Sequence, residues 1–530
     1  MSRPLARHAG VVSALTAASR VLGLVRETVF FALFGASGSI VSDAFYAANR
    51  IPNLFRDLFA EGALTAAFVP TFAQVAEKHG EERAWRLGRS VATALVLAVA
   101  ALSVLGIVFA PGVVSIVAPG FGDIDGKAEL TVHLTRILWP FLLFASLAAV
   151  WAGMLNSRGR FTAPAAAPMM LSVATLGVGV PLAYVLDPTF GARAIVGLAI
   201  GVLCGGLLQW GVQLRPLRRE GFRYRPALDL CDPDLRRVLA LMALAVVGVS
   251  ATLINVVVNT RFATGMGDGP LTWLVGAFRL VQLPIGVFGV AVATVAIPSL
   301  SRDTAREDIV AFRALLGRSI RLVLVLCIPS ACGLMVLARP LVSLIYGHGR
   351  FDATDVEQAA AAVRFYALGL AGYAAIKVLA PALYALGDTR RPALVSLFSI
   401  GVNVCLSWTL AIKVGLGHRG LALSVSVVAV TNVTLLAWVM RRHVGPYLRA
   451  EVLAPGARIA LASAGMTAVC LGARHAVEAL LGVSFLADAV ALATAVGASL
   501  VAFALLTRAL RIAEADELLA AIASRLPRRR

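Results

Sequence analysis

Long runs of apolar residues without a single charged side chain constrain this sequence more than any other feature. Such runs occupy residues 90–122, 161–186, 194–214 and 421–440. A helix needs about 20 apolar residues to cross a bilayer, so each run is long enough to do so. The chain carries only 15% charged residues, whereas a soluble protein carries about 25%. The sequence therefore predicts an integral membrane protein that crosses the bilayer many times.

The hydropathy pattern predicts an all-α fold of about 14 transmembrane helices. The predicted spans start near residues 11, 41, 91, 130, 164, 194, 237, 270, 318, 358, 393, 420, 456 and 486. With these spans the arginine-rich loops fall on one side, so the positive-inside rule places both termini in the cytoplasm. The formal charge of +19 reflects the same bias. It does not indicate a nucleic-acid partner, because no basic stripe is interleaved with exposed aromatic residues.

A repeated motif divides the sequence into two halves. VPTFAQ at residues 69–74 and LGRS at 87–90 recur as IPSLSR at 297–302 and LGRS at 316–319, an offset of 228 to 229 residues. The offset spans six predicted helices, an even number, which gives both halves the same orientation. This predicts two six-helix lobes related by a pseudo-two-fold axis along the membrane normal, with a central cavity between them. The alternative is an old duplication without a surviving cavity.

Four domains follow from the repeat. They are an N-terminal six-helix lobe (1–230), a C-terminal six-helix lobe (231–450), two extra transmembrane helices (451–510) and a basic cytoplasmic tail (511–530).

The first predicted helix carries charges that a lipid-facing helix would exclude. A polar stripe at spacings of three and four residues runs from Ser13 through Arg20 to Glu27, and Arg26 lies beside it. An arginine at the centre of a membrane helix costs at least about 2.5 kcal/mol, so such residues usually face a polar interior and mark a pathway.

The second predicted helix is more polar still. Asp43, Arg50 and Asp57 recur at heptad spacing on one face, Arg56 lies on an adjacent face, and Pro52 interrupts the helix between them. Lipid cannot accept a helix of this composition, so we expect these side chains to face protein or a water-filled cavity.

The second half carries an arginine in a comparable place, Arg279 on the eighth predicted helix, shortly before Pro284. Two interpretations of the intramembrane charges are open: paired ions that join helices, or a cavity that binds an anion. A guanidinium group stays protonated and presents a planar fork of donors that matches phosphate and carboxylate oxygens. The second interpretation therefore predicts an anionic ligand such as a pyrophosphate.

Four segments carry a recognisable pattern: ASRVLGLVRE (18–27), SDAFYAANRIPNLFRDLFAEGALTAAFVP (42–70), FRLVQLPIGVFGVAVATVAIPSLS (278–301) and IKVLAPALYALGDTRRP (376–392). The pattern resembles the MurJ/MviN family of lipid II flippases, within the multidrug/oligosaccharidyl-lipid/polysaccharide exporter superfamily. The resemblance implies movement of lipid II, an undecaprenyl-pyrophosphate-linked peptidoglycan precursor, from the cytoplasmic to the periplasmic leaflet of the bacterial inner membrane. Movement by alternating access of the two lobes is implied as well.

The resemblance also implies roles for individual residues. Substrate binding in a cationic central cavity is implied for Arg20, Arg26, Arg56 and Arg279. Gating or charge pairing is expected of Glu27, Asp43, Arg50, Asp57 and Glu61. The last two helices would line a groove for the polyprenyl tail. The implied partners are lipid II, membrane lipids and cell-wall synthesis enzymes.

Other functions fit less well. A flippase for another polyprenyl-pyrophosphate-linked oligosaccharide would use the same arginines and stays open, whereas an antiporter of cationic drugs would need a carboxylate-rich cavity. An enzyme is not expected, because the histidines and acids do not form the sets that metal-dependent or nucleophilic catalysis requires.

No cofactor or metal is predicted, and a coupling ion is not assigned. Some relatives bind sodium in the second lobe. The corresponding positions here offer neutral oxygens, whereas hard cations favour charged ones. These positions are Asn259, Asn403, Ser407 and Ser424.

Overall fold

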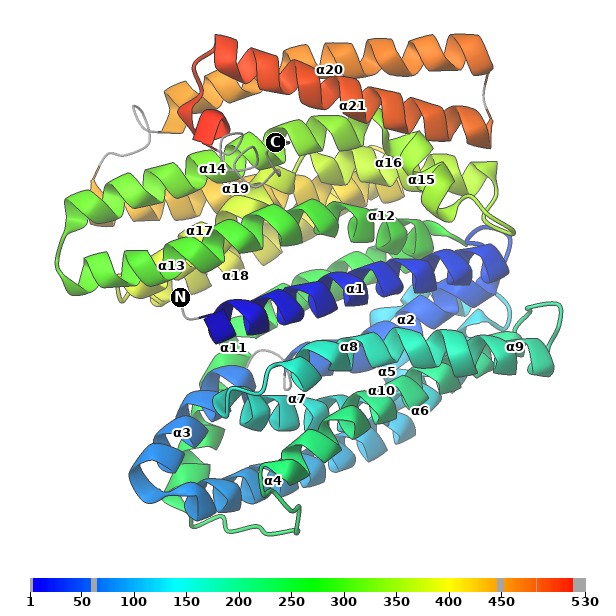
Figure 1. The fold of residues 1–530 in the computed structure, drawn as a ribbon. Coiled ribbons are helices and arrows are strands. Elements are labelled where there is room, and N and C mark those ends of the chain that lie inside the picture. Colours follow the sequence, from blue (N-terminus) through cyan, green and yellow to red (C-terminus); the bar gives the residue numbers. More distant parts are fainter. Residues whose placement is uncertain (1–2, 59–63, 446–451, 483, 518–530) are drawn as a thin grey trace. The chain divides into compact units, whose positions relative to one another are not determined.

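The computed structural model describes residues 3–58, 64–445, 452–482 and 484–517, and the regular secondary structure in these ranges is helical (Figure 1). Ten helices of the described chain are long and apolar enough to cross a membrane. A further pair, Ala353–Ala367 and Leu370–Ala385, is bent by 44° and raises the number to eleven. The prediction of an all-helical, multi-span membrane protein is confirmed.

Packing divides the chain into two units, and the first contains residues 1–272. Its helices are α1 (Arg3–Phe34), α2 (Ile40–Arg56), α3 (Leu64–His79), α4 (Glu81–Val108), α5 (Ala110–Val117), η2 (Pro119–Asp123), α6 (Lys127–Leu138), α7 (Phe141–Ser157), α8 (Thr162–Ala174), η3 (Thr175–Gly179), α9 (Val180–Leu186), α10 (Ala194–Arg219) and α11 (Pro233–Thr264). Helix α11 packs against α3, α4 and α5 of this unit. The predicted lobe boundary at residue 230 was drawn from the sequence repeat and stays a prediction.

The second unit contains residues 273–530. Its helices are α12 (Pro270–Pro284), whose first turn belongs to the first unit, η4 (Ile285–Gly289), α13 (Val290–Ala305), α14 (Ile309–Val336), α15 (Ala338–Tyr346), α16 (Ala353–Ala367), α17 (Leu370–Ala385), α18 (Arg390–Ser407), η5 (Trp408–Lys413), α19 (His418–Val444), α20 (Ala454–Leu481) and α21 (Phe485–Ala509). Helices α20 and α21 run side by side, and they pack on α14 and α15 respectively (Figure 1).

Side-chain caps set the starts of two helices that matter below. Ser39 Oγ accepts the backbone N–H of Val41 at the start of α2, at 3.3 Å. An Asp352 carboxylate oxygen accepts the N–H of Asp355 at the start of α16, at 2.9 Å. A cap satisfies N–H groups that the first helical turn leaves without a partner in the helix. The caps therefore hold the first turns of α2 and α16, in which Asp43 and Asp355 lie.

The core of the first unit centres on α3, α4 and α7. Phe68 and Phe72 of α3 are buried with Trp151 of α7. Trp139, between α6 and α7, packs so closely on Gly106 of α4 that a Cβ at this glycine would lie 2.1 Å from the indole ring. A side chain at residue 106 would collide with the ring, so the glycine is what allows α4 to approach the α6–α7 turn.

Helix bounds recur between the two parts of the chain. α1 and α11 each contain 32 residues, and α4 and α14 each contain 28. α4 ends before Phe109 and α14 ends before Leu337, 337 − 109 = 228 positions later, and a short helix follows each break. The apolar run 90–122, which resembles one continuous span in the sequence, is therefore interrupted. Pro111 follows the break, and proline is tolerated in the first turn of a helix but not in its interior.

Candidate functional site

The charges of α1 lie close to its contact with α2. Arg20 is exposed, Arg26 is half-buried, and Glu27 is buried at 3% exposure. The Arg26 guanidinium contacts Glu27 Oε1 at 3.2 Å, and the hydroxyl of Tyr46 on α2 donates to Glu27 Oε2. A buried carboxylate is tolerated only when it is paired and hydrogen-bonded. Glu27 therefore ties α1 to α2 and neutralises part of the charge of Arg26.

Aromatic rings pack beside the buried Glu27 carboxylate. The ring of Phe30 packs on Phe45 and Tyr46, with centroids 5.1 and 5.0 Å apart. A water-excluded setting strengthens the interaction between the tyrosine hydroxyl and the carboxylate.

The end of α2 carries a second ion pair. Arg56 NH2 and Nε lie 2.7 and 3.2 Å from Asp57 Oδ1. Both side chains are partly exposed, at 26% and 42%, so the pair can exchange for another anion at small cost. Arg50, one and a half turns earlier on the same helix, is half-buried.

The start of α2 carries a network that the sequence did not reveal. Lys127, the first residue of α6, contacts Asp43 Oδ2 at 3.3 Å and Asp268 Oδ1 at 2.6 Å. The Asp43 carboxylate also accepts the backbone N–H groups of Gly269 and Thr272, both at 2.9 Å, and the Thr272 hydroxyl at 2.5 Å. The side chains of Asp43 and Lys127 are both fully buried.

This network links three segments of the first unit: the start of α2, the start of α6 and the connection from α11 to α12. The Lys127 ammonium also lies over the ring of Phe121, 4.3 Å from its centroid. Because two buried charges need several polar partners to offset the loss of water, the three segments must stay together for the network to persist. The sequence offered one signal, an isolated lysine beside the acids Asp123 and Asp125, but its partners are distant in the chain.

Arg279 lies on α12 in the second unit and is half-buried. The preceding residue, Phe278, packs its ring on Tyr366 of α16 and Tyr373 of α17, with centroids 5.2 and 6.1 Å apart. A π-helical turn, η4, follows Pro284. Arg279 belongs to a different unit from Arg20, Arg26 and Arg56, so the grouping of all four in one cavity stays a prediction.

Two further predictions concern particular residues. Glu61 lies in the range 59–63, outside the described residues. Three of the four positions considered for sodium form a buried neutral cluster, in which Ser407 Oγ lies 2.9 Å from Ser424 Oγ and 3.4 Å from Asn403 Oδ1. The fourth, Asn259, lies on α11 in the first unit and is half-buried. Hydroxyl and amide oxygens that bond one another are a poor set for a hard cation.

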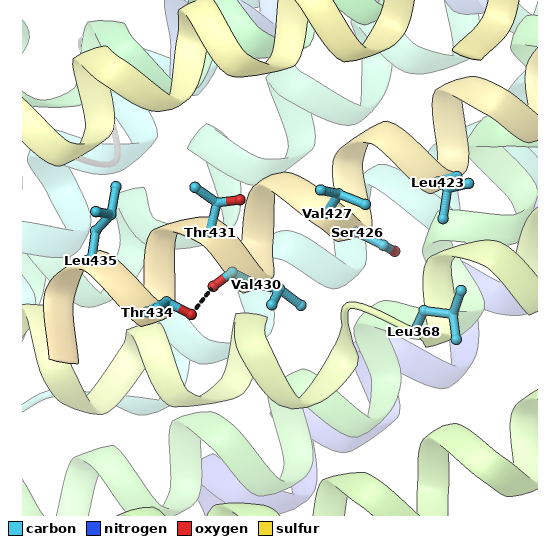
Figure 2. Close-up of a pocket in the computed structure, with 8 residues that line it drawn as sticks. All are labelled: Leu368, Leu423, Ser426, Val427, Val430, Thr431, Thr434 and Leu435. Carbon is cyan, nitrogen blue, oxygen red and sulfur yellow. Dashed lines mark hydrogen bonds between the residues drawn. The ribbon is translucent and has the colours of Figure 1, made fainter. Parts of the chain in front are cut away.

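A pocket in the second unit has a different character. It has a volume of about 390 Å³ and runs along one face of α19, from Leu423 to Leu435, with Leu368 opposite (Figure 2). Its lining side chains are apolar or hydroxyl-bearing, and the Thr434 hydroxyl donates to the carbonyl oxygen of Val430 at 2.8 Å. The lining residues carry no charge, so this pocket is not suited to bind an anion.

Solved structures of transporters share this fold. A lipid II flippase MurJ in an inward closed conformation superposes with a TM-score of 0.77 at 24% identity, covering 94% of this chain and 99% of that one. An inward-facing multidrug resistance MATE family transporter of the MOP superfamily superposes with a TM-score of 0.64 at 14% identity, covering 83% of this chain and 99% of that one.

Sequence comparison resolves the family. The sequence profile described as "Lipid II flippase MurJ" matches residues 30–515. The lipid II flippase MurJ of Burkholderia cenocepacia is 39% identical over 438 residues, which cover 82% of this chain and 83% of that protein. The probable lipid II flippase MurJ of Vibrio cholerae is 34% identical over 478 residues, 89% of either protein. This chain therefore belongs to the MurJ family of lipid II flippases.

Proposed function

We propose that this chain is a lipid II flippase. It moves the undecaprenyl-pyrophosphate-linked peptidoglycan precursor from the cytoplasmic to the periplasmic leaflet of the bacterial inner membrane, and it catalyses no covalent step. The observation that carries this proposal is family membership over residues 30–515. That range includes α2 with Arg56 and α12 with Arg279, and the arginines are the residue type that recognises a pyrophosphate.

The proposed architecture has about 14 transmembrane segments in two six-helix lobes, related by a pseudo-two-fold axis along the membrane normal, plus α20 and α21. Ten or eleven segments of the described chain are long and apolar enough to cross the membrane. Helix α1, the pair α2 and α3, and α11 would supply the remainder. Helices α1 and α2 carry intramembrane charges, which is expected of helices that line a polar pathway. The equal lengths of α1 and α11 and of α4 and α14 support the repeat.

The substrate-binding residues are Arg20, Arg26, Arg56 and Arg279. Guanidinium groups hold the pyrophosphate and sugar head by charge-assisted hydrogen bonds, while the polyprenyl tail stays in an apolar setting along α20 and α21. The partly exposed Arg56–Asp57 pair supports this role, because the arginine can leave its carboxylate for a phosphate at small cost.

Gating and charge pairing fall to the acids and to Arg50. Glu27 restrains Arg26, Asp57 restrains Arg56, and Asp43 with Lys127 holds the start of α2 against α6 and the α11–α12 connection. Alternating access requires that some such contact break in each cycle. Glu61 is the fifth proposed gating residue.

The membrane potential supplies a driving force that needs no coupling ion. It contributes about 2.3 kcal/mol per charge per 100 mV, and an inside-negative potential drives an anionic pyrophosphate outward. Transport is then downhill as long as the arginines do not move with the substrate. Both termini lie in the cytoplasm in this arrangement, because the arginine-rich loops face that side.

Replacement in cells tests the function. The chain is expressed in a bacterium whose own lipid II flippase is shut off, and the lipid II accessible to a periplasmic cleaving enzyme is quantified. Wild type should restore cleavage, whereas Arg279→Ala and Arg20→Ala should accumulate in the membrane without restoring it. The matched control is Arg306→Ala, which replaces an exposed arginine in the loop after α13 and should act as wild type.

Each result decides between substrates. If membrane-inserted wild type leaves lipid II uncleaved, lipid II is not the substrate. Restored export of another polyprenyl-pyrophosphate-linked oligosaccharide would then reassign the substrate to that class.

A further inference from the structure

Helix α12 carries Arg279, and its position depends on contacts that begin two turns earlier. The indole Nε1 of Trp273 donates to Asp355 Oδ1 at 2.9 Å. Trp273 is 9% exposed and Asp355 is fully buried. The same indole packs on the ring of His418, with centroids 5.0 Å apart. Trp273 is thus held between α16 and the start of α19.

Asp355 is itself held in place. It lies in the first turn of α16, and its backbone N–H is accepted by the capping carboxylate of Asp352. The positive end of the helix dipole favours a carboxylate at this place. Because both its backbone and its charge are stabilised by α16, Asp355 is a fixed acceptor for the indole.

Trp273 and Arg279 lie on different faces of α12. Six residues along an α-helix correspond to a rise of about 9 Å and a rotation of about 240°. The buried indole therefore anchors one face of α12, while Arg279 extends from another. A rotation of α12 about its axis would move the guanidinium and the indole together.

A second contact on the same partner helix lies next to the arginine. The ring of Phe278 packs on Tyr366, which follows Asp355 by eleven residues on α16. The hydroxyl of Tyr346 donates to the carbonyl oxygen of Gly276 at 3.4 Å. Helix α16 thus contacts α12 at Trp273 and again at Phe278. The Trp273 contact joins a side chain of α12 to a side chain of α16 by a directed hydrogen bond.

The sequence repeat places a polar contact at the equivalent positions of the first half. The offset of 228 to 229 residues pairs Lys127 with Asp355 (355 − 127 = 228) and places Asp43 within one or two positions of Trp273 (273 − 43 = 230). All four residues lie in the first turns of their helices, α6, α16, α2 and α12. Asp43 and Lys127 form a buried ion pair. A polar bond therefore joins α2 to α6 in the first half and α12 to α16 in the second half, although the side chains differ.

We propose that Asp355 is a positioning residue for Arg279, acting through Trp273: it fixes the rotation of α12 and so holds the guanidinium ready for the anionic head of the substrate. This inference rests on the proposed function for its ligand. The positioning itself is independent of the ligand and can be tested without it.

The first test measures the position of residue 279 without substrate. In a variant whose six native cysteines are replaced, Arg279→Cys is introduced and its alkylation rate by a thiol reagent is followed in membrane vesicles. Asp355→Leu and Trp273→Phe each remove the hydrogen bond, and each should change the rate by about fivefold or more. Asp355→Asn keeps an oxygen acceptor and should stay within about twofold of the parent.

A matched control excludes a general loss of structure. Asp488 is another buried acid in the first turn of a helix of this unit, α21, and it lies 3.8 Å from Arg339. Asp488→Leu should leave the alkylation rate of the Arg279→Cys variant unchanged. The proposal is overturned if Trp273→Phe inserts normally and leaves the rate as in the parent, or if Asp355→Asn changes it as much as Asp355→Leu.

The second test connects the position to the ligand. Binding of labelled lipid II to the purified full chain is measured for wild type, Asp355→Leu, Arg279→Ala and the double variant. If Asp355 acts through Arg279, Asp355→Leu weakens binding about tenfold in the wild-type background and has no further effect with Arg279→Ala. Equal losses in both backgrounds overturn the proposal.

The alkylation test and the binding test can fail independently of one another. If wild type does not bind lipid II, the proposed substrate fails, while the alkylation rates still decide whether Asp355 positions residue 279.

Discussion

Two pairs of helices, which the proposed repeat makes equivalent, are joined by different chemistry. In the first half the starts of α2 and α6 are joined by ions, Asp43 and Lys127, and Lys127 has a second carboxylate in Asp268, which is 31% exposed. In the second half, α12 and α16 are joined by a neutral indole that donates to Asp355. A lysine can exchange one carboxylate for another, whereas an indole has a single donor with a fixed direction. We infer that the Asp43–Lys127 contact is suited to break and re-form during transport, whereas the Trp273–Asp355 contact is suited to persist.

The largest difference should follow from the removal of Lys127. Lys127→Met leaves the buried carboxylate of Asp43 without its cation and should destabilise the protein by about 3 to 5 kcal/mol. Thermal unfolding in detergent measures the effect as a lowered midpoint. The control is Lys78→Met, which replaces an exposed lysine of α3. A midpoint no lower than that of Lys78→Met would contradict the importance of the network.

A smaller loss is expected from the second-half contact. Trp273→Phe removes the indole donor but keeps an aromatic ring, and should cost about 1 to 3 kcal/mol because the Asp355 oxygen loses a partner. Unfolding midpoints are compared with those of Trp408→Phe, whose indole is 46% exposed. If the two variants unfold alike, the Trp273 bond contributes nothing.

The ionic contact should also show coupling. When Lys127→Met is already present, Asp43→Asn removes an unbalanced charge, so its effect should be more favourable than in wild type by about 1 kcal/mol. A double-mutant cycle of unfolding free energies measures the difference. Additive effects would show that the two side chains do not act on one another.

The smallest effect concerns two loops in matching positions. In the loop after α9, Asp187 accepts the hydroxyl and N–H of Thr189 and the N–H of Gly191. The pKa of Asp187 lies below its ordinary value, chiefly because the Thr189 hydroxyl donates a hydrogen bond to the carboxylate. The loop after η5 instead turns through Gly415 and Gly417, at φ 76° and 56°, and its hydrogen bonds join backbone atoms.

Acid should loosen only the first loop. Because the folded pKa of Asp187 lies below the unfolded one, its contribution is present above about pH 4 and is lost as the pH falls through the folded pKa. Hydrogen exchange at about pH 6 and about pH 3, corrected for the intrinsic rate, should show reduced protection at Gly191 and constant protection at Gly417. Asp187→Ala should abolish the pH dependence. Equal loss at both glycines would contradict this account.

The sequence predicted the features that local composition determines. Apolar runs identified the helices, and the resemblance carried by residues 18–27 and 42–70 identified the family. Helix α4 nonetheless begins at Glu81, about ten residues before the predicted span, because helix continues beyond the part that hydropathy can detect. The ion pairs Arg26–Glu27 and Arg56–Asp57 could have been predicted from the sequence, because the partners are adjacent in the chain.

Contacts between distant residues could not be predicted in the same way. Lys127 is separated by 84 residues from Asp43 and by 141 from Asp268, and Trp273 is separated by 82 from Asp355. None of these pairs has a spacing that a helix or a turn would impose. The repeat offset relates the two contacts to one another, but it becomes informative only after one of them has been seen.

Transport by the purified chain tests the central claim most directly. The protein is reconstituted in liposomes with fluorescent lipid II, and the fraction that changes leaflet is measured under a membrane potential negative on the side from which lipid II departs. We expect translocation by wild type, its loss in Arg279→Ala, and its decline when the potential is collapsed. Translocation by Arg279→Ala at the wild-type rate would contradict the proposed arginine site, and translocation that survives complete collapse of the potential would contradict the proposed driving force.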